Sequence, residues 1–308
     1  MSNVALERSY RDCQKIASSS GSNFFRSFYL LRPDRRRGMM ALYAFARVVD
    51  DWGDDTSDSP VANQGTEWHD WIDTCRASSL DVPKSRQSSF KKFDSIRLAL
   101  ADTIDRFSMP IQYLHDLVDG VASDLIGNVS ISDREQLDRY CYLVASSVGL
   151  ACLSIWGGNG TDVDEAAIHC GIAFQLTNIL RDVREDGERG RIYVPADLMF
   201  AHNVDPERWR AGQPDGDWRA VLETLVGWAR IEYRSGWNVF DALDVDGQRM
   251  FSLMWESYRR LLERIANNLD TVWERRVCLT RFEKTSLYLK HAVTPWYRQM
   301  RSRNGGYG

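Results

Sequence analysis

The sequence predicts an all-α fold in a single domain. Apolar residues recur at spacings of three and four over several long segments, which is typical of amphipathic helices. Alternating stretches bounded by hairpin dipeptides are scarce, so few strands are expected. No stretch of the 308 residues is long or biased enough to be a domain linker. We therefore expect one domain over residues 1–308, with its core at about residues 15–290.

Five segments carry the helical pattern, at residues 36–52, 137–156, 162–183, 222–240 and 250–268. The second is rich in small residues, and Gly157 and Gly158 are expected to end it. The third is mostly apolar around its circumference, which predicts a position at the centre of the bundle. Three polar segments, 54–66, 77–89 and 201–217, are expected to be loops, and the last residues a frayed tail.

Composition narrows the classes of function. The formal net charge of -4 gives no electrostatic reason to expect nucleic acid as a partner. The six cysteines are scattered without a C-x-x-C pair, which favours reduced, mostly buried thiols. No run approaches the roughly 18 apolar residues of a membrane span, and the charged N-terminus shows no signal peptide. A cytoplasmic protein is expected, and contact with a membrane surface stays open.

The first notable motif ends the 36–52 helix. Asp50 and Asp54 are four residues apart, as are Asp51 and Asp55, so each pair shares a helix face about 6 Å along the axis. Carboxylates at a helix C-terminus oppose the macrodipole and one another. A hard divalent cation would remove this conflict, because oxygen ligands at such a spacing can bind Mg²⁺. The alternative is a solvated acidic helix end.

The second motif lies in the helix predicted to be the most buried. Asn178, Asp182 and Asp186 fall at i, i+4 and i+8, which makes one polar stripe on an apolar helix. Buried carboxylates without partners are costly, so the stripe is expected to face a ligand, a metal or a water-filled cavity. A stripe satisfied by arginine ion pairs is the alternative.

Two acidic stripes that face one cavity would suit a cluster of two or three Mg²⁺ ions and a diphosphate. Metal binding stabilises a departing diphosphate, so an allylic C–O bond can ionise without a protein nucleophile. The carbocation must then be kept from water by apolar and aromatic walls. The chain has 11 Trp, 12 Tyr and 12 Phe, which is enough to line such a cavity, although most are expected to be ordinary core.

The motifs resemble those of squalene and phytoene synthases. ALYAFARVVDDWGDD at 41–55 is similar to the family's first aspartate-rich motif, and QLTNILRDVREDGERGRIYVP at 175–195 to its second. The resemblance extends through SSGSNFFRSFYLL at 19–31 and YCYLVASSVG at 140–149. It covers roughly residues 15–290, in the family's order. Trp52-Gly53 departs from the small or aliphatic pair that is commoner between the aspartates.

The resemblance implies an isoprenoid-synthase helical bundle with a central hydrophobic cavity that holds two farnesyl or geranylgeranyl diphosphates. It implies roles for thirteen residues. The metal ligands would be Asp50, Asp54, Asp182 and Asp186. Residues at the reacting carbons and beside the metal would be Tyr140, Gln175 and Asn178. Residues that bind the diphosphates or flank the prenyl chains would be Phe24, Phe28, Tyr43, Arg47, Tyr258 and Arg276.

The family shares a 1′-1 coupling that gives a cyclopropylcarbinyl diphosphate. The combination VVDDWGDD with NILRDVREDGERGRIYVP most resembles the bacterial presqualene diphosphate synthases of the hopanoid pathway. We therefore expect presqualene diphosphate from farnesyl diphosphate, without NADPH. The alternatives are a phytoene or dehydrosqualene synthase and a complete NADPH-dependent squalene synthase. Downstream isoprenoid-pathway enzymes are further candidate partners.

Two other classes of protein are weighed against this expectation. A terpene cyclase would carry an N-D-x-x-S-x-x-x-E motif, which is absent. A non-catalytic assembly protein of the same fold would be expected to lose aspartates from one stripe, and both stripes are intact. The five histidines show no metal-ligand spacing, so each is expected on the surface or in the core.

Overall fold

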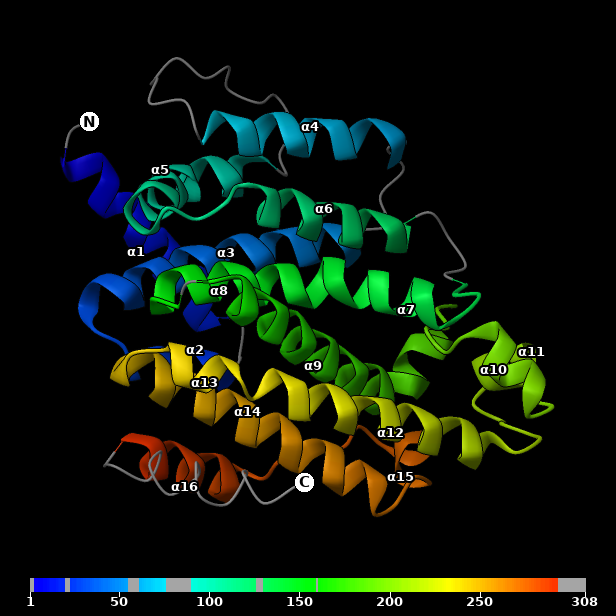
Figure 1. The fold of residues 1–308 in the computed structure, drawn as a ribbon. Helices are drawn as coiled ribbons and strands as arrows, with labels where there is room; N and C mark the ends of the chain where they lie inside the picture. The colour runs from blue at the N-terminus through cyan, green and yellow to red at the C-terminus, as the bar shows by residue number, and fades with distance from the viewer. Residues whose placement is uncertain are drawn as a thin grey trace.

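The computed structural model describes residues 3–19, 23–54, 61–75, 90–125, 130–158 and 160–292. Over these residues the chain is a bundle of helices (Figure 1). The elements are α1 (Asn3–Ser19), α2 (Asn23–Ser27), η1 (Phe28–Leu30), α3 (Pro33–Asp54), α4 (Val61–Thr74), α5 (Phe90–Phe107), α6 (Gln112–Leu125), α7 (Arg134–Cys141), η2 (Tyr142–Ser146), α8 (Ser147–Trp156), α9 (Thr161–Glu188), α10 (Ala196–Ala201), α11 (Pro206–Arg210), α12 (Trp218–Gly236), α13 (Val239–Ala242), α14 (Val245–Ala266), α15 (Thr271–Glu274) and α16 (Arg281–Ala292).

The all-α prediction is confirmed. Within the described ranges, the β-type pairing is a single parallel bridge between Ser130 and Ile192. The longest helix, α9, lies at the centre and packs against α12, η2, α8, α14 and α15, as its apolar circumference predicts (Figure 1). One contiguous hydrophobic cluster runs from Tyr10 to Val277, and α16 closes a smaller cluster over α14.

The helix ends follow local signals. Pro33 occupies the first turn of α3, where its missing N–H costs nothing. Gly157 ends α8 in a left-handed conformation (φ 87°), and the amide of Gly158 donates to the Leu153 carbonyl at 3.2 Å. The predicted stop at these two glycines is confirmed.

The predicted loop at 54–66 is partly wrong. Helix α4 begins at Val61, so the second half of that segment is helical, while residues 55–60 and the predicted loop at 77–89 lie outside the described residues. Burial explains the difference, because Trp68, Trp71 and Ile72 of α4 are at most 5% exposed and draw the helix onto the core. The predicted loop at 201–217 contains the short helix α11. The predicted frayed tail also lies outside the described residues.

The predicted helix at 137–156 contains a π-helical turn. Residues Tyr142–Ser146 form η2 between α7 and α8. Ser146 approaches α9 closely, and its Oγ donates to the Ile168 carbonyl at 2.8 Å. Gly171 of α9 faces Ser146 at a distance that leaves no room for a side chain. Single π turns are frequent at functional sites, and this one directly follows Tyr140 and Cys141.

The same segment is more apolar than the sequence analysis expected. Arg134–Trp156 is long and apolar enough to cross a membrane by length and composition, with a mean hydropathy of 1.2 over its best window. However, 56% of that window is buried inside the bundle. Its apolar character is that of a core helix, since it packs between α6 and α9. The expected free thiols are present: Cys278 is exposed and the other five are buried.

Candidate active site

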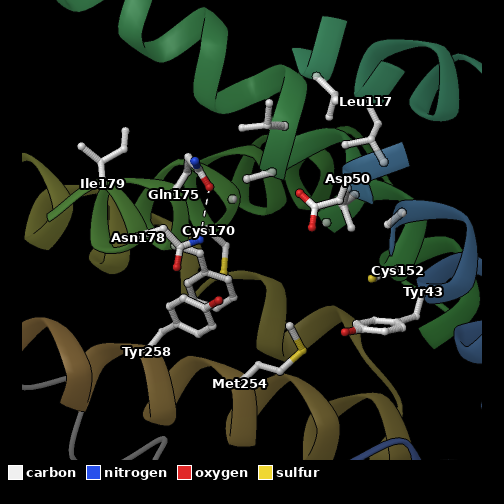
Figure 2. Close-up of a pocket in the computed structure, with 18 of the residues that line it drawn as sticks. Tyr43, Asp50, Leu117, Cys152, Cys170, Gln175, Asn178, Ile179, Met254 and Tyr258 are labelled. Atoms are coloured by element: carbon white, nitrogen blue, oxygen red, sulfur yellow. Dashed lines mark hydrogen bonds between the residues drawn. The ribbon is translucent and has the colours of Figure 1, made fainter. Parts of the chain in front are cut away.

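A cavity of about 590 Å³ lies between α3, α6, α8, α9 and α14 (Figure 2). Eleven of the thirteen predicted site residues line it: Phe28, Tyr43, Arg47, Asp50, Tyr140, Gln175, Asn178, Asp182, Asp186, Tyr258 and Arg276. The side chains of the other two, Phe24 and Asp54, lie outside the described part of the structure. Segments distant in sequence therefore meet in one place.

Helix α3 lines the cavity with one face. Met39, Leu42, Tyr43, Ala46, Arg47 and Asp50 recur every three or four residues along it. Arg47 bridges Asp50 at 2.9 Å and Asp51 at 2.7 Å, and the side chain of Asp50 remains 60% exposed. The last turns of α3 thus bring a carboxylate and a guanidinium to the solvent-facing end of the cavity.

Helix α9 supplies the predicted polar stripe. Gln175, Asn178, Asp182 and Asp186 all line the cavity. The Asn178 amide donates to Gln175 Oε1 at 3.2 Å, as Figure 2 shows. The other polar atom of this side chain, Asn178 Oδ1, is buried and accepts no hydrogen bond from the described residues. A buried acceptor that faces a cavity is suited to a ligand or a cation there.

Two arginines bind Asp182. Arg276 contacts it with Nε at 2.9 Å and with a terminal nitrogen at 3.2 Å. The neighbouring Arg181 donates from Nε at 2.8 Å and makes a second, shorter ion pair. Arg276 also lies 3.7 Å from Glu185. The alternative of an arginine-paired stripe therefore applies to Asp182.

The carboxyl groups of Asp186 and Asp124 are largely buried, and neighbouring carboxylates repel them. Burial and the neighbouring Asp182 raise the pKa of Asp186 to about 7, although Arg191 and Arg189 lower it. Burial likewise raises the pKa of Asp124 to about 6, again against Arg191. The carboxylates act on one another, so an ionised member of the group favours protonation of its neighbours at this end of the cavity.

Asp124 is a site residue that the sequence analysis missed. It comes from the end of α6, and its Oδ2 accepts a hydrogen bond from the Tyr140 hydroxyl at 3.1 Å. The Tyr140 ring stacks on Tyr193 with centroids 4.7 Å apart. Burial raises the pKa of Tyr140 well above its ordinary value, so this phenol stays a donor. The available signal was an acid at the end of an apolar helix, the same feature that marked Asp50.

Arg191 and Tyr193 were also missed as site residues, although both lie within the second motif. They line the cavity from the segment that follows α9. This segment is tied to the start of α7 because Ile192 bridges to Ser130 and the Ala196 amide donates to the Ile131 carbonyl at 2.8 Å. The sequence could not show that the chain folds back over the cavity there.

The donor set fits a hard divalent cation. Asp50, Asp182, Asp186 and Asn178 Oδ1 all present oxygen to the cavity, and oxygen is the donor that Mg²⁺ prefers. Among the described side chains, no group of three His, Cys, Asp or Glu residues is already close enough to hold a metal. A cation there would draw the carboxylates inward and relieve the repulsion that raises their pKa values.

The rest of the cavity is apolar and deep. Met39 and Asp50 are eleven residues apart on α3, which corresponds to about 16 Å along the axis. Tyr258 stacks on Phe174 at 4.5 Å, and Phe28 meets Tyr43 edge-on at 5.8 Å. Burial raises the pKa of Tyr258, although Arg181 and Asn178 lower it. The remaining wall combines large and small residues, which include Ala145, Gly149, Cys152, Trp156, Phe251 and Met254.

Comparison with known proteins agrees with this geometry. The sequence profile described as squalene/phytoene synthase matches residues 17–283. The chain belongs to the squalene/phytoene synthase family. Phytoene synthase of Mycobacterium tuberculosis is 32% identical over 286 residues, which cover 92% of this chain and 90% of that protein. Phytoene synthase of Thermus thermophilus is 32% identical over 285 residues, which cover 90% and 93%.

Solved structures share the fold. A dehydrosqualene synthase superposes with a TM-score of 0.77 at 24% identity, over 96% of this chain and 98% of that one. The squalene synthase HpnC of Alicyclobacillus acidocaldarius superposes with a TM-score of 0.74 at 21% identity, over 86% and 95%. The isoprenoid-synthase bundle expected for the squalene/phytoene synthase family is therefore confirmed. Members of this family are prenyltransferases that act on prenyl diphosphates.

Proposed function

We propose that this protein couples two prenyl diphosphates head to head in a Mg²⁺-dependent reaction. One observation carries the proposal: the carboxylates of α3 and α9 and the arginines Arg47, Arg181 and Arg276 gather at one end of a deep apolar cavity. The charged end suits a diphosphate with its cations, and the apolar depth suits a prenyl chain. Family membership supports the same reaction class.

The position of each side chain in the cavity suggests its role. Asp50, Asp182 and Asp186, with Asp54 as the remaining acid of the first motif, would hold Mg²⁺. The bound ions would stabilise the negative charge of the departing diphosphate. Arg47 and Arg276 would bind diphosphate oxygens, because a planar guanidinium binds phosphate with two parallel hydrogen bonds.

The proposed coupling needs no nucleophile from the protein, because the two substrates supply every electron pair. The allylic C–O bond of one substrate breaks, and both electrons leave with the diphosphate. The double bond of the second substrate attacks that carbon, and the cyclopropane ring closes as a proton passes to the released diphosphate. Tyr140 and Gln175 would face the reacting carbons from α7 and α9, and the aromatic pair Tyr258–Phe174 would shield the cation from water.

For the substrate and product we propose farnesyl diphosphate and presqualene diphosphate, with no requirement for NADPH. Large side chains in the apolar wall, among them Phe28, Trp156 and Phe251, limit the room for longer chains, which favours the shorter substrate. Phytoene synthesis is the second candidate, favoured by the names of the relatives at 32% identity.

One incubation tests both levels of the proposal. Purified protein is given Mg²⁺ with farnesyl or geranylgeranyl diphosphate, with and without NADPH, and products are identified by mass spectrometry. Presqualene diphosphate from farnesyl diphosphate in both conditions is expected. Squalene that forms only with NADPH, or phytoene from geranylgeranyl diphosphate alone, would replace the finer proposal and keep the reaction class. Turnover of neither substrate would overturn the class itself.

A further inference from the structure

Two histidines meet outside the cavity. His69 of α4 and His115 of α6 face each other with their Nδ1 atoms 2.6 Å apart, and their rings stack with centroids 4.8 Å apart. His69 Nε2 lies 2.9 Å from Asp119 Oδ1, and His115 Nε2 lies 3.3 Å from Asp73 Oδ1. The sequence analysis expected each histidine on the surface or in the core and did not predict that these two would meet. We call these four residues the His–Asp cluster.

Each of the two helices contributes a histidine and an aspartate at the same spacing. His69 and Asp73 are four residues apart on α4, and His115 and Asp119 are four apart on α6, so each pair shares a helix face. His69 reaches the later acid of α6 while His115 reaches the later acid of α4, which requires antiparallel helices. The two helices lie side by side in Figure 1 and contact each other.

Counting protons shows what holds the cluster together. Its three polar contacts each need one hydrogen: one from each Nε2 to a carboxylate, and one between the two Nδ1 atoms. Two neutral imidazoles carry only one N–H each. Without a third proton, two lone pairs would face each other, or an imidazole lone pair would face a carboxylate. A third proton, on one imidazole ring or on the carboxyl group that faces it, completes the three contacts.

A proton fits the gap between the rings better than a metal ion. Two imidazoles on one Zn²⁺ each bond at about 2.0–2.1 Å, so in a tetrahedral site their nitrogens lie about 3.3 Å apart. The observed 2.6 Å is the length of a short hydrogen bond. Among the described residues, the charged groups that contact the two rings are Asp73 and Asp119. The nearby Asp116 instead binds Gln112 and Tyr142.

We infer that the His–Asp cluster is a proton-dependent latch that docks α4 on α6. Loss of the third proton removes the central hydrogen bond, and gain of a fourth places two N–H groups against each other. The latch is adjacent to the first acidic motif, because Trp68 precedes His69 and packs on Trp52 with ring centroids 5.4 Å apart. The docking of α4 thus bears on the end of α3 that carries Asp50.

A double-mutant cycle on the full-length protein tests the latch. His69→Gln, His115→Gln and the double variant are unfolded with urea across roughly pH 5 to 9, the range in which histidine changes charge. The single changes should be non-additive near neutral pH, with a coupling factor of about tenfold in the folding equilibrium constant, since the bond is charge-assisted. The coupling should fall toward one at the alkaline end. His202→Gln, which lies outside the cluster, is the matched control.

Three outcomes would overturn the inference. The first is additive single changes, and the second is a coupling that does not vary with pH. The third is a coupling that requires added Zn²⁺ and is abolished by a chelator, since a metal ion would then be the bridging cation. If the double variant does not fold, hydrogen exchange of wild-type protein decides the question. Protection of the α4 amides should fall with rising pH relative to those of α12, and a constant ratio would contradict the latch.

Discussion

Replacing Gly171 by alanine should separate the role of the π turn from that of the cavity wall. A Cβ at this position would lie 2.5 Å from Ser146 Oγ and 2.6 Å from the Ser146 backbone nitrogen, so η2 or α9 must move. Overpacking of this kind costs about 1–3 kcal/mol. The change from glycine to alanine in a helix returns about 0.5–1 kcal/mol. We expect a net destabilisation of about 1–2 kcal/mol.

Gly149→Ala is the matched control. Gly149 also lines the cavity and lies in the adjoining helix α8, but its new Cβ would meet nothing closer than the Ala167 carbonyl at 3.6 Å. This variant should be as stable as wild type or slightly more stable. Urea unfolding gives both free energies, and turnover of farnesyl diphosphate reports on Tyr140, which lies two residues before the turn. Equal stability of the two variants would refute the close-approach reasoning.

Three further predictions concern the site and the C-terminal helix. Asp186→Asn should reduce turnover by at least about a hundredfold and weaken the response to Mg²⁺, measured as the metal dependence of the rate; an unchanged response would remove Asp186 from the ligand set. Phe28→Ala removes a ring that is 1% exposed in the cavity wall, so it should cost about 3 kcal/mol of stability. It should also increase the share of products made from geranylgeranyl diphosphate when the two substrates compete. An unaltered share would show that Phe28 does not limit chain length. Glu256 binds α16 through His291 at 2.9 Å and Lys290 at 2.7 Å, and although burial opposes its ionisation, these partners lower its pKa to about 2. A carboxyl group whose pKa is lowered in the folded state stabilises the fold at pH values above its ordinary pKa of about 4.3, and this stabilisation is lost as the pH falls toward 2. Measured by urea unfolding, Glu256→Gln should therefore cost about 2 kcal/mol at pH 7 and progressively less below about pH 4. A deficit that is the same at both pH values would contradict the assignment.

The sequence predicted those parts of the site that helical periodicity fixes. Asn178, Asp182 and Asp186 share a face of α9 because residues four apart must do so, and the apolar surroundings of that stripe placed it inside the bundle. The same reasoning put Asp50 and Asp54 on one face of the helix that ends at this motif, and Asp50 lines the cavity. In both cases the information lies within one helix, so no tertiary contact had to be known.

Contacts between distant segments could not be predicted in this way. Asp124 reaches Tyr140 across sixteen residues, and His69 reaches His115 across forty-six, through helix packing that no local pattern specifies. The start of α4 at Val61 was missed for a related reason, because tertiary burial of Trp68 and Trp71 overrides the polar, loop-like composition that precedes it. The π turn was missed because it packs against α9 at Gly171, a tertiary contact that no local pattern specifies.

The double arginine pairing of Asp182 has a thermodynamic consequence. Its two oxygens cannot coordinate a cation and keep every bond to Arg181 and Arg276, so a cation at Asp182 frees guanidinium hydrogen bonds for a diphosphate. A diphosphate that captures Arg276 likewise frees the carboxylate for a cation. The two ligands are thus coupled through an exchange of partners, and each must raise the affinity for the other by the same factor. Such reciprocity would keep Asp182 paired until both have arrived.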